Sequence, residues 1–401
     1  TCFWAPPAMG EQRGEAVLPR QRWSPRGRGA MPPAGILNHL EEGCPPRDVT
    51  GGPVQTRRAT YISAMTRDPV LQFTDRGIYC PVGDFHIDPW LPVDRALITH
   101  GHADHARDGM GRYLATHEAL PVMRHRLGDV ALEGIGYGET RRIGGANVSF
   151  HPAGHVPGSA QIRVEVAGEV FVASGDYKVE DDGLSTPFEP VRCHHFITES
   201  TFGLPVFRWH PQADIAAEIN GWWRACAAAG KTAFLGAYSL GKAQRLLSML
   251  DPGIGLILTH TAVENTNEVL RAQGITLPDT TLVTPELVPK EHPGALVLSP
   301  PSALGSQWAR RFGPQESAFA SGWMALRGVR RRRAGDRGFV ISDHADWRGL
   351  LWAITETGAE NIYVTHGYTD VFTRYLNDEG WNAEVVPTQF EGESLDTGDA
   401  A

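Results

Sequence analysis

Short apolar runs separated by turn residues fill the chain from residue 69 to about residue 200. Runs rich in Val, Ile, Phe and Leu that are bounded by Gly, Pro or Asp are typical of β-strands. Between residues 121 and 151, short strands are expected to alternate with Gly-rich turns. The other expected strands are residues 70–73, 77–80, 85–88, 95–99, 160–166, 169–174 and 193–198. Many short strands with few helices favour packed sheets over a doubly wound sheet.

The pattern changes at about residue 203, where helical periodicity becomes frequent. Apolar residues recur on one face over residues 215–229 and 240–250, which predicts two amphipathic helices. Further along, the expected elements are strands at 232–235, 254–258 and 295–298 and a helix at 262–272. This alternation predicts an α/β unit with parallel strands. The last expected elements are strands at 339–342 and 362–365 with a helix at 347–357 between them.

Composition places the chain among soluble globular proteins, with 41% hydrophobic and 21% charged residues in 401 positions. No apolar run is long enough to span a bilayer, so no membrane partner is expected. The formal charge of -9 neither suggests nor excludes a nucleic-acid partner, because a nuclease needs only a local basic groove. Five scattered cysteines without a C-x-x-C pair predict no disulfide framework, which fits a cytoplasmic protein.

The N-terminal extension, residues 1–65, lacks both periodicities and is rich in Pro, Gly and Arg. Two interpretations stay open: a basic nucleic-acid-binding arm around residues 20–28, or a disordered tail or sequence upstream of the true start. We favour the second, because patterned sequence begins just after Met65. At the other end, residues 392–401 are expected to form an acidic disordered tail.

Metal-binding residue types concentrate directly after the apolar run at residues 95–99. Within six positions the chain carries His100, His102, Asp104 and His105. If the run is a buried strand, these side chains lie on the loop at its C-terminal end, where α/β folds place their chemistry. Imidazole nitrogen and carboxylate oxygen are ligands of zinc and similar ions. The cluster therefore predicts a metal site.

Five further positions repeat this arrangement, in which an apolar run ends near a metal-binding side chain. They are Asp88, His155, Asp176, His344 and His366. A single His or Asp at a strand end is more often a cap or turn residue, but that explanation is hard to extend to six sites. The four residues of the first cluster together with His155, Asp176 and His366 make seven candidate ligands. Because one zinc ion takes about four ligands, the number implies two metals that share a carboxylate.

Several motifs resemble known families. Residues 100–105 resemble the metallo-β-lactamase signature, and residues 197–203, 342–346 and 364–367 are similar to motifs of the β-CASP nucleases. Residues 78–85, 237–244 and 321–328 are similar to the branch of bacterial ligase-associated DNA exonucleases. The resemblance covers residues 66–390. It implies an αββα metallo-β-lactamase sandwich built from residues 66–204 and 339–391, with an α/β β-CASP domain, residues 205–338, inserted between them.

The resemblance also implies roles for individual residues. The implied ligands are His100, His102 and His155 for the first metal, Asp104, His105 and His366 for the second, and Asp176 for both. Asp88 would orient ligands from behind. Two divalent ions, Zn or alternatively Mn, would activate a hydroxide that attacks phosphorus. His344 would give a proton to the leaving oxygen, and the negative charge of Glu199 would keep that imidazole protonated.

Two segments are candidates for contacts with substrate phosphates. Residues 236–239 precede an expected helix, so Ser239 and Lys242 are candidate phosphate ligands; the alternative is a helix cap with a solvated lysine. Arg330 and Arg331 belong to the basic run at residues 327–333, which is either a stripe that follows phosphates or a solvated loop. We expect Trp323 to pack in the core, although stacking on a base is the alternative.

Four functions are compatible with these residues. The leading hypothesis is a two-metal DNA exonuclease of repair and ligation, with an ATP-dependent DNA ligase as functional partner. The nearest rival is an RNA-processing nuclease with the same site. A metallo-hydrolase of small esters or lactams is weaker, because such enzymes lack the inserted domain and the Glu199/His344 pair. A non-enzymatic scaffold would require missing ligands, and all seven candidates are present.

Overall fold

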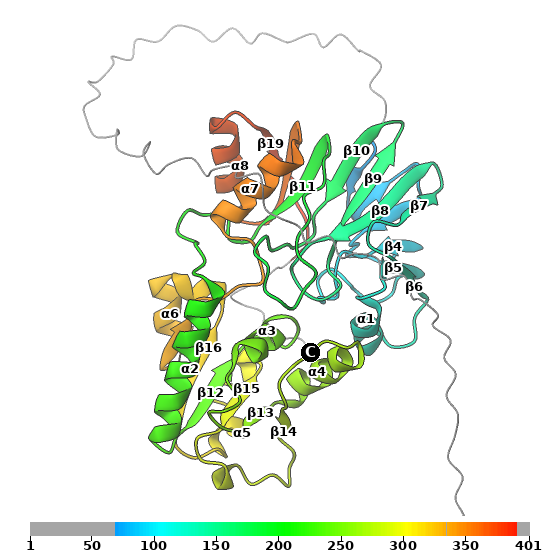
Figure 1. Cartoon of the computed structure of the whole chain (residues 1–401). Coiled ribbons are helices and arrows are strands. Elements are labelled where there is room, and N and C mark those ends of the chain that lie inside the picture. Colours follow the sequence, from blue (N-terminus) through cyan, green and yellow to red (C-terminus); the bar gives the residue numbers. More distant parts are fainter. Residues whose placement is uncertain (1–68, 334, 391–401) are drawn as a thin grey trace, which may run out of the picture. The chain divides into compact units, whose positions relative to one another are not determined.

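A computed structural model describes residues 69–333 and 335–390, so the expectations for residues 1–65 and 392–401 lie outside the described part. Within that part, the strands form three sheets (Figure 1). None of the described helices combines the length and apolar character that crossing a bilayer requires. The three sheets are taken in turn below, because the first two carry the candidate site.

The first sheet has six strands in the order of the chain. They are β1 (Gln72–Thr74), β2 (Gly77–Cys80), β3 (Phe85–Ile87), β4 (Arg95–Leu97), β5 (Arg112–Thr116) and β6 (Leu132–Ile135). Pairing is antiparallel from β1 to β3 and parallel from β3 to β6. The C-terminal ends of β3 and β4 therefore lie at the same edge.

The second sheet has seven strands in the order β19-β18-β11-β10-β9-β8-β7. They are β7 (Thr140–Ile143), β8 (Ala146–Pro152), β9 (Ala160–Val166), β10 (Glu169–Ala173), β11 (His195–Ser200), β18 (Asn361–Gly367) and β19 (Asn382–Val385). The strands expected at residues 160–166 and 169–174 are confirmed, and they pair as the antiparallel hairpin β9–β10 around Ala167 and Gly168. Parallel pairing of β10, β11 and β18 brings their C-terminal ends together.

The third sheet is entirely parallel, in the order β14-β13-β15-β12-β16-β17, as the alternating pattern predicted. Its strands are β12 (Thr232–Gly236), β13 (Ile257–Thr259), β14 (Thr281–Leu282), β15 (Leu296–Ser299), β16 (Gln315–Ala320) and β17 (Arg337–Phe339). Its helices are α2 (Gln212–Ala228), α3 (Lys242–Met249), α4 (Thr261–Ala272), α5 (Gln307–Arg310) and α6 (Arg327–Arg333), with 3-10 turns at Pro289–Glu291, Pro301–Ala303 and Gly322–Ala325. We call residues 212–339 the third-sheet segment.

Alternate side chains of the first two sheets point either into a core that both sheets share or toward helices on their outer faces. In β10, Phe171 joins a core shared with the first sheet, whereas Val172 joins a core that includes residues of α7 (Trp347–Thr357) and α8 (Thr369–Asp378). Figure 1 shows both helices beside β11 and β19. In β4, Leu97 likewise joins the shared core, and Ala96 packs with residues of α1 (Leu120–Leu127). Because successive strand residues point to opposite faces, these strands require apolar layers on both sides.

Two predicted elements are wrong. Residues 120–127 form the helix α1, not strands and turns, and Pro121 stands in its first turn, where the missing N–H costs nothing. The expected strand at residues 339–342 ends at Phe339, and residues 340–346 form a loop. This loop carries Asp343 and His344. The helix predicted at residues 347–357 is confirmed by α7, which Asp346 caps through a 2.8 Å bond from Gly349 N.

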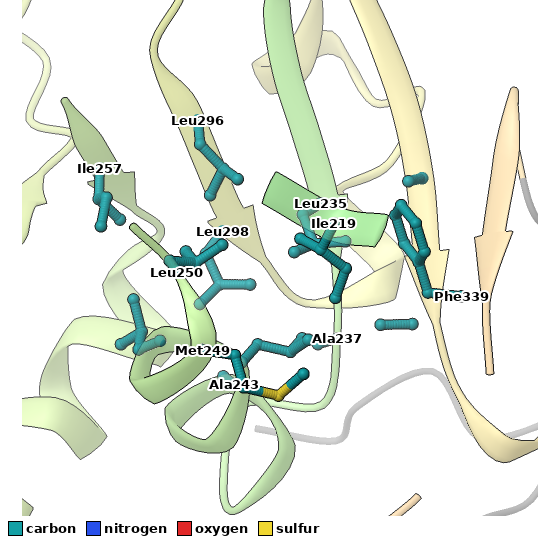
Figure 2. Close-up of a cluster of buried hydrophobic side chains, with 14 of the residues drawn as sticks. Ile219, Leu235, Ala237, Ala243, Met249, Leu250, Ile257, Leu296, Leu298 and Phe339 are labelled. Carbon is teal, nitrogen blue, oxygen red and sulfur yellow. The ribbon is translucent and has the colours of Figure 1, made fainter. Parts of the chain in front are cut away.

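The core of the third-sheet segment supplies a stability prediction. Leu298 is fully buried in the cluster drawn in Figure 2. Replacing Leu298 with alanine should lower the free energy of unfolding by about 2–5 kcal/mol, because it leaves a cavity. Leu256→Ala is a matched control, since Leu256 is 38% exposed and should cost less than about 1 kcal/mol. Urea unfolding followed by tryptophan fluorescence measures both, and equal losses would contradict the described packing.

Candidate metal centre

Ends of neighbouring strands bring the predicted ligands together. Asp88 follows β3, and residues 100–105 begin three residues after β4. Asp176 follows β10, whereas His366 lies within the last residues of β18. Gly175 has a φ of +57° and a Cβ there would lie 2.6 Å from Thr99 Oγ1, so only glycine lets the Asp176 loop approach the first sheet this closely.

The first group of ligand atoms converges on one point. His102 Nδ1 lies 3.1 Å from His100 Nε2 and 3.1 Å from His155 Nε2. Asp176 Oδ2 lies 3.6 Å from His100 Nε2 and 3.8 Å from His155 Nε2. Ligands about 2.1 Å from a tetrahedral zinc ion are about 3.4 Å from one another, so these separations fit a zinc-sized ion. The structure thus assembles four side chains that could hold a metal.

The opposite ring nitrogens show which nitrogen carries the proton. His102 Nε2 lies 3.2 Å from the carbonyl oxygen of Leu240, and His155 Nδ1 lies 2.9 Å from that of Asp343. A carbonyl oxygen only accepts, so both of these nitrogens must donate. The lone pairs then sit on His102 Nδ1 and His155 Nε2, the two atoms that face the common point.

The ligand atoms of the second group are less tightly clustered. His105 Nε2 lies 3.6 Å from Asp104 Oδ2 and 3.6 Å from Asp176 Oδ2, and His366 Nε2 lies 2.9 Å from Asp176 Oδ1. The ring centroids of His105 and His366 are 6.1 Å apart. Asp88 stands behind this group, where its Oδ2 accepts from His105 Nδ1 at 2.7 Å. That bond leaves His105 Nε2 directed toward Asp176.

Buried atoms of this second group test whether a cation fits. His105 Nε2, Asp176 Oδ1 and His366 Nε2 are buried, and apart from the 2.9 Å contact between the last two, the described residues offer them no hydrogen-bond partner. Such atoms are costly to bury unless something binds them. Two imidazole nitrogens and a carboxylate oxygen are a donor set for a divalent ion, so the residues present fit a metal.

Burial and neighbouring charges shift the pKa values of the histidines in opposite directions in the two groups. Burial lowers the pKa of His100 and His155, so both are neutral at pH 7, as metal ligation requires. Burial also opposes protonation of His105, but the carboxylates of Asp104, Asp176 and Asp88 outweigh it and raise its pKa to about 10. His105 therefore carries a proton in the metal-free protein, and this proton must leave before Nε2 binds a cation.

His344 and Glu199 form a pair beside the metal ligands. His344 Nδ1 lies 2.9 Å from Glu199 Oε2 and 3.1 Å from Oε1, and Glu199 is 1% exposed. Glu199 Oε1 also accepts from Tyr177 N at 2.8 Å. Glu199, Asp176 and His366 could also hold an ion as a set, but the bonds to Tyr177 and His344 already occupy Glu199. The rings of His344 and His155 lie 4.6 Å apart, which places the pair at the first group.

Some residues at this centre could not be found from the sequence. Phe390 stacks on His105 at a centroid distance of 4.4 Å and meets His366 edge-on at 5.8 Å. The indole of Trp209 donates to the carbonyl oxygen of His344 at 2.8 Å. Neither position follows a metal-binding pattern, so the sequence carries no signal for them. Asp343 lies next to His344 in its motif, and that adjacency was an available signal.

The candidate phosphate contacts differ in exposure and in their position relative to helices. The basic run at residues 327–333 forms the helix α6 and not a loop. Arg330 and Arg331 are exposed on this helix. The helix α3 begins at Lys242, which leaves Ser239 outside its first turn. Lys242 is only 2% exposed, with Nζ 3.8 Å from Asp343 Oδ2, and this burial argues against the predicted phosphate contact. Trp323 packs against Phe202 at 5.0 Å, as expected of a core residue.

Comparison with known proteins reveals relatives among nucleic-acid enzymes, although no family model matches the chain. A probable DNA ligase of Opitutus terrae is 28% identical over 324 residues, which cover 77% of this chain and 30% of that protein. The endoribonuclease YSH1 of Mycosarcoma maydis is 28% identical over 200 residues, or 40% of this chain and 22% of that protein. The YSH1 protein of Yarrowia lipolytica is 27% identical over 194 residues, or 40% and 23%.

These similarities support a relationship to the β-CASP nucleases. The chain spans less than a third of the length of these relatives, so it corresponds to one part of each of them. Among solved structures, a protein of unknown function from Enterococcus faecalis V583 matches with a TM-score of 0.51 and 10% identity, over 74% of this chain and 80% of that one. This likeness concerns the fold alone and agrees with a mixed α/β architecture.

Proposed function

We propose that the chain is a metal-dependent nuclease that hydrolyses phosphodiester bonds, most specifically a DNA exonuclease. The observation that carries this proposal is the meeting of the seven predicted ligands with the His344–Glu199 pair at one centre. A metal site alone would suit many hydrolases. A buried carboxylate–imidazole pair beside it supplies a proton donor for a poor leaving group.

We propose an αββα metallo-β-lactamase sandwich with an inserted β-CASP domain as the architecture. The layering supports this, because the first two sheets share one core and pack on α1 and on α7 and α8 through their outer faces. The inserted domain corresponds to residues 205–338, which include all but one residue of the third sheet. The exception is Phe339, the last residue of β17.

Two divalent ions, Zn or Mn, would be held by the seven ligands. His100, His102 and His155 would hold the first, Asp104, His105 and His366 the second, and Asp176 would contact both. When bound, the ions supply Lewis-acid activation of water and neutralise charge on the phosphate. Asp88 orients His105 Nε2 through the bond to Nδ1, and Thr99 N steadies Asp88 Oδ1 at 2.8 Å.

The proton for the leaving oxygen is assigned to His344. Glu199 accepts from His344 Nδ1 and so fixes the plane of the ring, and we assign proton transfer to the opposite nitrogen, Nε2. Trp209 and Asp346 support this placement, because Trp209 donates to the carbonyl oxygen of His344 through its indole and to Asp346 Oδ2 through its backbone N–H. The His344 segment is thereby held on both sides.

DNA is the proposed substrate because the relative that matches 77% of this chain is named a DNA ligase. The same match supports a link to DNA ligation. We propose a functional association with an ATP-dependent DNA ligase, in the cytoplasm. RNA is the second candidate substrate, since the shorter matches are to proteins named endoribonucleases.

Side-by-side cleavage of end-labelled single-stranded DNA, double-stranded DNA and RNA, with Zn²⁺ and with Mn²⁺, tests the substrate. We expect DNA to be shortened progressively from one end. Cleavage of RNA with DNA left intact would replace the proposal with the RNA-processing function. Cleavage of neither, in protein that contains metal, would contradict both.

Exposed arginines of α6 provide a test of the phosphate contacts. Replacing Arg331 with glutamine should weaken DNA binding about equally for all sequences and lower the slope of log Kd against log salt concentration by about one. Arg374→Gln is the matched control, because Arg374 is 86% exposed on α8 and is not a candidate phosphate contact. Fluorescence anisotropy over a range of salt concentrations measures both slopes. Identical slopes in the two variants would show that α6 is a solvated surface.

A further inference from the structure

Residues 240–242 are the last two residues before α3 and the first residue of α3, and they reach the ligands of the first metal. The carbonyl oxygen of Leu240 accepts from His102 Nε2 at 3.2 Å. His102 is 138 positions earlier in the chain, on the loop after β4. Because this bond sets which nitrogen of His102 keeps a lone pair, a backbone atom of the third-sheet segment determines how a candidate ligand faces its ion.

Gly241 packs against Val156, the residue that follows a second ligand, His155. Its φ is +84°, and a Cβ built there would lie 2.3 Å from Val156 Cγ1, next to His155 in the chain. The same Cβ would lie 3.6 Å from Asp343 Oδ2. A separation below 3.0 Å forces a shift of one partner, so any side chain at position 241 must move the loop or displace Val156.

Lys242 and Arg245 hold the residue that orients His155. Lys242 Nζ lies 3.8 Å from Asp343 Oδ2, and Arg245 Nη1 lies 3.7 Å from Asp343 Oδ1. Arg245 also donates to the carbonyl oxygen of Ser342. All three charged side chains are at most 7% exposed, so their attraction is weakly screened. The carbonyl oxygen of Asp343 in turn accepts from His155 Nδ1 at 2.9 Å.

We infer that residues 240–242 are a positioning element for the first metal, so that the third-sheet segment sets the affinity of the metal site. The inference rests on the proposed metal centre and goes beyond it, because it assigns a role to residues that touch no ion. Two independent contacts converge in it: Leu240 O orients His102, and Lys242 acts on His155 through Asp343. The buried position of Lys242 is explained by this role and not by contact with a substrate phosphate.

Gly241→Ala tests the inference, with Gly274→Ala as its matched control. Gly274 has a φ of +87° in the same segment, and its Cβ would meet nothing within 4 Å. Both variants introduce the same backbone strain, but only Gly241→Ala presses on Val156. Titration of metal-free protein with Zn²⁺ against a chromophoric chelator gives the Kd of each ion. We expect Gly241→Ala to raise the Kd for one of the two ions by about 10- to 100-fold. Gly274→Ala should leave both Kd values unchanged.

A second pair of variants covers the case in which Gly241→Ala does not fold. Lys242→Met keeps the length of the side chain and removes its charge, and Lys231→Met is the control because Lys231 is 44% exposed. We expect the same selective loss of Zn²⁺ affinity in Lys242→Met alone. Co²⁺ absorption spectra of the loaded variants should show altered coordination at that site.

The outcomes separate this inference from the proposed function. Wild-type Zn²⁺ affinity in folded Gly241→Ala or Lys242→Met overturns the inference and leaves the nuclease proposal standing. Equal weakening in Gly241→Ala and Gly274→Ala also overturns it, because strain alone would then explain the loss. If the wild-type protein binds no Zn²⁺, the proposed metal centre fails and this inference fails with it.

Discussion

Replacing Asp176 with alanine should lower the rate of phosphodiester cleavage by about a thousandfold or more. Asp176 is 2% exposed and lies within 4 Å of His100, His105, His155 and His366, so it contacts both groups. Its loss removes the shared carboxylate and several kcal/mol of charge stabilisation. The measurement is single-turnover cleavage of labelled DNA together with the metal content of the same protein.

Asp181→Ala is the control for this variant, because Asp181 is exposed on the loop that follows and should leave the rate unchanged. Metal content should fall in Asp176→Ala and remain at the wild-type value in Asp181→Ala. Substantial cleavage by Asp176→Ala in buffer that contains excess metal would contradict the two-metal account.

Replacing His344 with alanine should slow cleavage by about 100- to 10,000-fold while the metal content stays near two ions per chain. The effect is that of losing a general acid, since Glu199 holds the His344 ring through Nδ1. Cleavage of a substrate with a good leaving group, such as a nitrophenyl phosphodiester, should be slowed much less. That difference distinguishes a proton donor from a structural residue.

His210→Ala provides the matched control, because His210 is exposed and lies outside both metal groups. Loss of metal from His344→Ala would make this histidine a ligand instead of a proton donor. Equal slowing for good and poor leaving groups would remove it from proton transfer altogether.

Local patterns determined much of the fold in advance. The helix α7 has the residues predicted for it, and its limits have local causes: Asp346 caps its start and Gly358, at a φ of +61°, ends it. The helix α1 was missed, since only Val122 and Met123 of its residues are buried and the segment has no clear helical period. Tertiary packing, not local preference, makes residues 120–127 helical.

The strand predicted from the apolar run at residues 339–342 is wrong for a physical reason. Val340 and Ile341 suit a strand, but only Phe339 continues the pairing with β16. The chain then leaves the sheet, and the backbone of Ser342 and Asp343 binds Arg245 and His155 instead. Bonds to side chains far away in the chain have replaced the strand ladder.

The candidate ligands could be predicted because their residue types and their positions at strand ends indicate metal binding. The residues that support them were not, since Leu240 acts through its backbone and Phe390 through stacking on His105. Neither action depends on a residue type that signals metal chemistry. Only the three-dimensional approach of distant segments reveals them.

Reconstitution of metal-free protein tests the central claim most directly. The protein is titrated with Zn²⁺, and in parallel with Mn²⁺, while cleavage of end-labelled single-stranded DNA is followed. The account predicts no cleavage without metal, binding of two ions per chain, and activity that rises as the second ion binds. Full activity in the presence of a chelator, or with a single ion bound, would contradict it.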